Sequence, residues 1–196
     1  MKPGWFVLIA LILIGFWFVL RARRNRILHS AAQMKRFGQP PDPKVYEGLR
    51  NLMLQGSRAK FGIGPSSKPT EPFGVLMDWG IPSGSATIVA IADGTASVYL
   101  SSGGGFLGGG QSHESIRSAA MTTVKAAEEV QQLMHPTTTF PLAPLGQVNF
   151  YILTDAGVYT ASASEDDLRR HRSPFYKLGD SAQAIITEYR MIQETK

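Results

Sequence analysis

The part of the sequence best suited to chemistry is a glycine-rich stretch between a predicted strand and a predicted helix. Residues 99–120 read YLSSGGGFLGGGQSHESIRSAA, with six glycines among the eight residues 103–110. The segment Gly103–Gly108 fits G-x-G-x-x-G, in which glycines let the backbone approach a phosphate at a helix N-terminus. One interpretation is therefore a small anionic ligand or nucleotide, and the candidate binding residues are Gly103, Gly104, Gly105, Gly108, Gly109, Gly110 and Ser112.

Neighbouring residues argue against a dinucleotide site. The dinucleotide pattern expects an acidic residue at the end of the next strand, about twenty residues further on. Glu128 and Glu129 stand at that distance, but in the middle of a predicted helix. No Lys-Ser or Lys-Thr pair follows Gly110, so a Walker-type phosphate loop is excluded.

Two further interpretations of the glycines need no small ligand. Glycine permits positive φ and close contact between a strand and a helix, so the stretch can be purely architectural. Alternatively, Phe106 and Leu107 form the exposed apolar tip of a loop that contacts a partner protein. The sequence favours the packing interpretation.

Other reactive side chains do not form a catalytic or metal-binding constellation. His29, His113, His135 and His171 are dispersed without metal-ligand spacing, and the chain has no cysteine. The sequence therefore predicts no catalytic residue, no metal site and no cofactor, and it favours a role other than catalysis.

The N-terminus carries a segment of membrane-anchor character. Trp5–Leu20 is an unbroken apolar run of sixteen residues, roughly 24 Å long as a helix, and long flanking side chains can make up the remaining bilayer thickness. Four arginines follow it: Arg21, Arg23, Arg24 and Arg26. The positive-inside rule then predicts a single-pass anchor over residues 1–20 with the C-terminal domain in the cytoplasm. A cleaved signal peptide is the alternative, but no A-x-A pattern adjoins the run.

Charge is distributed unevenly along the chain. Residues 21–60 contain ten Lys and Arg and two acidic residues, which gives this segment a net charge of +8. The chain from Phe61 onward carries a net charge of −4. A basic block beside an apolar run predicts contact with anionic lipid headgroups rather than with nucleic acid. Residues 21–41 are thus a basic juxtamembrane segment and Pro-rich linker, and residues 42–196 form the predicted cytoplasmic domain.

Hydrophobic periodicity within residues 42–196 predicts an α+β domain. Helices are expected from Pro43, after Gly110 and near the C-terminus, with strands near residues 74–81, 85–93, 94–102, 147–155 and 157–165. The order α-β-β-β-α-β-β-α indicates a mostly antiparallel five-stranded sheet flanked by helices. Small roadblock, longin and profilin-like domains share this number of elements, but no motif residue links the chain to any of them.

Two functional hypotheses follow. The first is a membrane-anchored cytoplasmic domain for protein interaction or regulation, similar to a scaffold, which binds a partner protein or a second copy. The alternative is a sensor or enzyme that binds a small anion or nucleotide at Gly103–Gly110.

Overall fold

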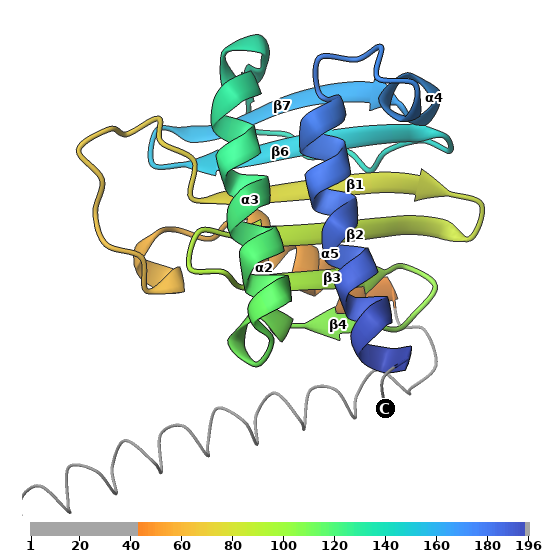
Figure 1. The fold of residues 1–196 in the computed structure, drawn as a ribbon. Helices are drawn as coiled ribbons and strands as arrows, with labels where there is room; N and C mark the ends of the chain where they lie inside the picture. Colours follow the sequence, from red (N-terminus) through yellow and green to blue (C-terminus); the bar gives the residue numbers. More distant parts are fainter. Residues whose placement is uncertain (1–42, 195–196) are drawn as a thin grey trace, which may run out of the picture. The chain divides into compact units, whose positions relative to one another are not determined.

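The computed structural model of the chain describes residues 43–194, which form an antiparallel sheet with helices on both faces (Figure 1). The predicted anchor (residues 1–20) and the basic segment (residues 21–41) lie outside the described residues. Within residues 43–194, none of the helices combines the length and the apolar character that a bilayer crossing requires.

Seven strands make up the sheet, and every neighbouring pair is antiparallel. In spatial order they are β4 (Gly105–Leu107), β3 (Ala96–Leu100), β2 (Gly84–Ile91), β1 (Gly74–Ile81), β6 (Gln147–Thr154), β7 (Gly157–Ser164) and β5 (His135–Thr137).

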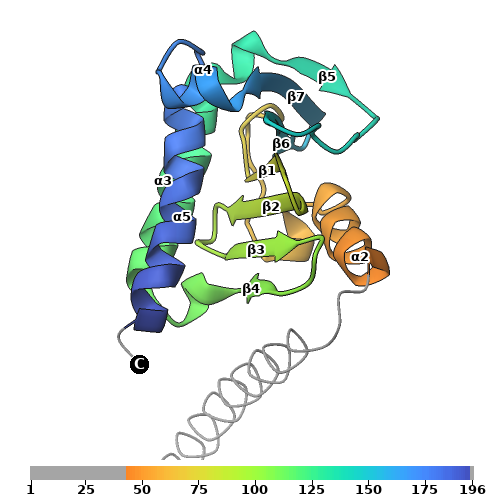
Figure 2. The same ribbon diagram turned by 90° about the vertical axis from the view of Figure 1, so that its right-hand side faces the viewer.

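The helices lie in two layers on opposite sides of this sheet. Helices α3 (Glu114–Val130) and α5 (Tyr176–Glu194) cover one face, whereas α2 (Pro43–Leu54) lies on the other (Figure 2). The short helix α4 (Glu165–Arg169) links β7 to α5, and 3-10 turns occupy residues 59–61, 109–111 and 131–133.

The predicted α+β class and antiparallel sheet are confirmed, but the predicted number of five strands is wrong. The two additional strands are both three-residue edge strands. Strand β4 lies inside the glycine-rich stretch, where composition predicted only a loop. Strand β5 contains Pro136, which an edge strand tolerates because one side of its backbone needs no partner.

The charged segment after β7 begins with a short helix. Its first five residues form α4, because the Ser164 side chain accepts a hydrogen bond from the Asp167 amide and caps the helix. Three acidic residues in the first turn favour the same helix through its dipole.

The sheet separates two hydrophobic cores. Alternating residues of β1 divide between them: Val75 and Met77 pack beneath α3 and α5, whereas Leu76 packs on the α2 side. Burial on both faces explains why the central strands are continuously apolar in sequence rather than alternating.

One cross-strand row on the α2 face is polar. Direct pairing aligns Ser162 with Asn149, Asn149 with Asp78, Asp78 with Thr87, and Thr87 with Tyr99. We call these five residues the polar row. Because Asp78 and Thr87 are completely buried, the elements covering this face must supply hydrogen-bond partners.

Candidate functional site

The glycine-rich stretch connects the edge of the sheet to helix α3. It comprises the turn between β3 and β4, strand β4 and a 3-10 turn at Gly109–Gln111. Ser112 follows and is exposed, while His113, in an extended conformation, immediately precedes α3 without a side-chain cap.

Tyr189 of α5 holds this stretch in place. Its hydroxyl accepts a hydrogen bond from the Gly109 amide (2.8 Å) and donates one to the Ala96 carbonyl (2.8 Å). The Phe106 ring stacks on the Tyr189 ring at a centroid distance of 4.5 Å. A Cβ at Gly109 would overlap the tyrosine hydroxyl, so glycine is needed for this contact.

Two further glycines serve close backbone packing. A Cβ added to Gly110 would overlap the Gly94 carbonyl oxygen. Gly105 has φ of +141°, and a Cβ there would overlap the Val98 carbonyl oxygen on the neighbouring strand. These contacts support the packing interpretation of the glycines.

Several amides that an anion would need already have partners. The Gly108 amide donates to Ser97 Oγ (3.2 Å), and the Gly109 amide donates to Tyr189. The Gly103 amide bonds the Leu100 carbonyl, and the Ser112 amide bonds the Gly109 carbonyl. Gly104 lies in the same turn with open space around it. Ligand binding at Gly103–Gly110 stays a prediction, and this geometry does not favour it.

Phe106 and Leu107 are half-buried, where the sequence suggested an exposed tip. Phe106 packs against the core beneath α3 and α5, and Leu107 packs against the core beneath α2. Their contact with a partner protein is untested, but most of their apolar surface is packed against the domain at the edge of the sheet.

The histidines of residues 43–194 are dispersed in the fold as they are in the sequence. His113, His135 and His171 lie on separate elements, and residues 43–194 contain no cluster of three His, Cys, Asp or Glu suited to a metal ion. His29 and the proposed membrane-surface residues Arg21, Arg23, Arg24 and Arg26 lie outside the described residues.

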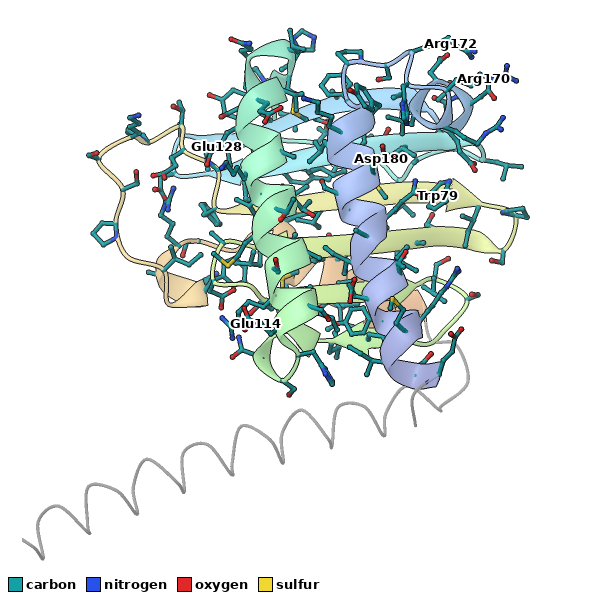
Figure 3. All side chains as sticks on the ribbon, in the orientation of Figure 1. Trp79, Glu114, Glu128, Arg170, Arg172 and Asp180 are labelled. Carbon is teal, nitrogen blue, oxygen red and sulfur yellow. The ribbon has the colours of Figure 1, made fainter. Side chains whose placement is uncertain are left out.

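The charged segment around α4 forms its own ion-pair network. Arg169, Arg170 and Arg172 all bond Asp166, at 2.6–2.9 Å. These hydrogen bonds, that from Arg170 foremost, lower the pKa of Asp166 well below its usual range. Figure 3 places Arg170 and Arg172 near α4, and Glu114 at the opposite end of the helical layer.

The α2 face is organised by a buried ion pair. Asp78, in the polar row, has a relative exposure of 0%, and Arg50 of α2 donates to its Oδ2 from Nε (2.8 Å) and Nη2 (2.6 Å). Thr87 donates to Asp78 Oδ1 (2.5 Å), and the Tyr46 hydroxyl lies 2.8 Å from Thr87 Oγ1. We call the Arg50–Asp78 pair the latch, because it fixes α2 to the sheet.

The surroundings of the latch favour the charged form of Arg50. Burial opposes the charge of Arg50, but the hydrogen bond and the negative charge of Asp78 outweigh burial and raise the Arg50 pKa. Burial also raises the pKa values of Tyr46 and Tyr151, and the charge of Asp78 adds to both shifts. The two tyrosines therefore stay neutral hydrogen-bonding groups beside the latch.

The latch also holds the proline-rich connection before β6. We call residues 140–145, with the sequence FPLAPL, the strap. Arg50 Nη2 donates to the Phe140 carbonyl (2.8 Å). Asn149 Nδ2 (3.1 Å) and Tyr151 Oη (2.5 Å) both donate to the Pro141 carbonyl. The first part of the strap is thus bound through its backbone.

The other end of the strap rests on β1. Leu145 forms an isolated parallel bridge with Gly80, and the Gly146 amide donates to the Gly80 carbonyl (2.9 Å). A Cβ at Gly80 would overlap the Pro144 carbonyl, so the strap needs glycine beneath it. Both ends are therefore fixed to the sheet.

The outer side of the strap is apolar and exposed. Pro141, Leu142, Pro144 and Leu145 are exposed, with 44% relative exposure at Leu142 and 68% at Leu145. No charged residue occurs between Pro136 and Thr154. The uncharged Pro-Leu composition of residues 140–145 is the sequence signal for this exposed apolar surface.

A second buried arginine lies beyond the end of α2. Arg58 donates to Asp155 Oδ2 (2.6 Å) and to the Glu71 carbonyl (2.7 Å), and its guanidinium lies over the Phe73 ring. Beside it is a depression of about 280 Å³ lined in part by Phe73, Leu153 and Asp155. Small-molecule pockets usually measure about 300–1,000 Å³, so this depression is a weaker candidate than the strap.

Comparisons with protein-family models, curated proteins and solved structures found no match to the chain.

We expect Gly110→Ala to lower the free energy of unfolding by about 3 kcal/mol, because its Cβ would displace the backbone at Gly94. The matched control is Gly48→Ala in α2, where a Cβ meets open space. That change should raise stability by about 0.5–1 kcal/mol. Urea unfolding measures both values, and equal effects would contradict the packing role of Gly110.

For the latch, we expect Arg50→Met to lower the free energy of unfolding by about 3–5 kcal/mol, because Asp78 would be left buried without a cation. Adding Asp78→Asn should restore part of that loss, since the amide removes the unpaired charge. Urea unfolding of the two single variants and the double variant tests this. A double variant less stable than Arg50→Met would argue against a buried uncompensated charge.

Alkaline unfolding should report on Tyr99 and Tyr189. Burial raises both pKa values to about 12 from an ordinary value of 10, because the ionised phenolate is disfavoured in the fold. Their contribution to stability is therefore present below about pH 10 and is lost as the pH rises toward 12. Chemical unfolding between pH 9 and pH 12 should show a shallower decline for Tyr189→Phe than for the wild type. An unchanged slope would contradict this assignment.

Proposed function

We propose that the chain is a membrane-anchored protein whose cytoplasmic domain acts by binding other proteins, in a scaffold-like or regulatory role. The observation that supports this most is the strap, an apolar and uncharged surface segment fixed by backbone hydrogen bonds at both ends.

The fixed backbone matters because binding entropy limits the affinity of surface loops. A flexible loop loses conformational freedom when a partner binds, whereas the strap has lost most of it on folding. Its exposed Leu142 and Leu145 then offer apolar area without a large ordering cost.

The membrane part of the proposal rests on the sequence. The apolar run Trp5–Leu20 and the arginines that follow it predict an anchor with the domain on the cytoplasmic side. A tether of this kind raises the local concentration of the domain near partners on the same membrane.

The glycine-rich stretch offers two weaker candidate sites, a partner contact at its tip and an anion site. Phe106 and Leu107 are half-buried, so we assign the partner contact to the strap instead. An anion held by the amides of Gly108 and Gly109 would have to displace Ser97 and Tyr189 as their partners.

Site-specific photo-crosslinking of the full chain in cell membranes tests the proposal. A photoreactive phenylalanine analogue at position 145 should form covalent adducts with another polypeptide. The same residue at position 121, which is exposed on α3, is the control and should form few or none. Absence of adducts from position 145, or equal yields at both positions, would contradict a partner-binding role for the strap.

A further inference from the structure

The burial pattern of the strap repeats every three residues. Phe140 is half-buried and Ala143 is buried, so this pair forms the edge that faces the sheet. The two remaining edges, both exposed, consist of Pro141 with Pro144 and of Leu142 with Leu145. A three-residue repeat is that of a polyproline II helix, which has three residues per turn.

Proline chemistry imposes the same conformation locally. Pro141 and Pro144 fix their own φ near −65°, and each restricts the preceding residue, Phe140 or Ala143, to extended backbone. Four of the six strap residues are therefore biased toward polyproline II geometry before any tertiary contact forms. The hydrogen bonds to the Phe140 and Pro141 carbonyls then hold this segment on the sheet.

We propose that the strap is a preformed polyproline ligand, which binds a groove lined with aromatic side chains on a partner protein. Such grooves recognise the spacing P-x-x-P, present here as Pro141-Leu142-Ala143-Pro144. The Pro141–Pro144 edge and the Leu142–Leu145 edge are the surfaces available to the groove. This proposal rests on the proposed protein-binding function and names the class of partner.

The chemistry around the strap favours this partner over a bilayer. Binding to anionic lipid depends on basic residues near the apolar contact. The strap lies within a segment, residues 136–154, that has no basic residue, whereas an aromatic groove needs none.

A second copy of the chain is also a poor match. The large hydrophobic side chains exposed in the described part of the chain are aliphatic or methionine: Val45, Leu52, Met121, Leu133, Leu142, Leu145 and Met191. None of these is aromatic, so an aromatic groove on a second copy would have to be built from rings that are half-buried in residues 43–194, such as Trp79 and Tyr159.

The test uses the full chain in lipid nanodiscs and a panel of purified SH3, WW and EVH1 domains, whose grooves are lined with aromatic residues. We expect at least one domain to bind with a micromolar dissociation constant. Leu142→Ser combined with Leu145→Ser should weaken that binding about tenfold or more, and so should Pro144→Ala. Met121→Ser combined with Leu133→Ser alters exposed side chains outside the strap and should leave binding unchanged.

A synthetic peptide covering Phe140–Gly146 gives a measurement that does not depend on the folding of a variant. It should compete with the full chain for the same domain. The proposal would be overturned by a domain that the peptide does not displace from the full chain and that binds the strap variants as tightly as the wild type.

Two other outcomes would also overturn it. If no domain binds the full chain at a domain concentration of about 1 mM, the proposed partner class is wrong. Crosslinking from position 145 decides separately whether the strap binds any protein. If the serine variants instead abolish self-association in sedimentation experiments, the occupant of the strap is a second copy.

Discussion

The α2 face of this domain depends on one guanidinium group. Arg50 donates two hydrogen bonds to the buried carboxylate of Asp78 and one to the carbonyl of Phe140. These contacts join a helix, a central strand and the strap, with sequence separations of 28 and 90 residues. A carboxylate with no exposed surface is tolerated only when it is paired and hydrogen-bonded, so Asp78 requires this arrangement or an equivalent one.

The two faces of the sheet therefore differ in the interactions that fix the position of the elements covering them. Beneath α3 and α5 a large apolar cluster packs against the sheet, with the two hydrogen bonds of the Tyr189 hydroxyl at one edge, and apolar packing alone tolerates small displacements. On the α2 face the polar row restricts the position of α2 and the strap, because a shift along the strands would separate Asp78 from Arg50. The strap gains a defined position from this restriction, which apolar contact alone would not give it.

Sequence reasoning located the elements whose signals are local. Periodicity identified α2, α3 and α5 together with the five longer strands. Strands β4 and β5 were missed because their three residues carry no pattern of their own and become strands through pairing with β3 and β7. The close contacts at Gly105, Gly109 and Gly110 support the packing interpretation that the sequence favoured, but the hydroxyl that Gly109 contacts belongs to Tyr189, 80 residues away.

The position of the strap could not be predicted from the sequence either, because it depends on contacts between distant residues. The prolines in FPLAPL already favour extended backbone, yet nothing local indicates which of its three edges is buried. That choice follows from Arg50, Asn149 and Tyr151, whose donors all point at two carbonyls of the strap. The same arginine also holds α2, so Arg50 contributes to the position of both α2 and the strap. The stability of the fold and the binding role that we propose for the strap thus both involve one side chain.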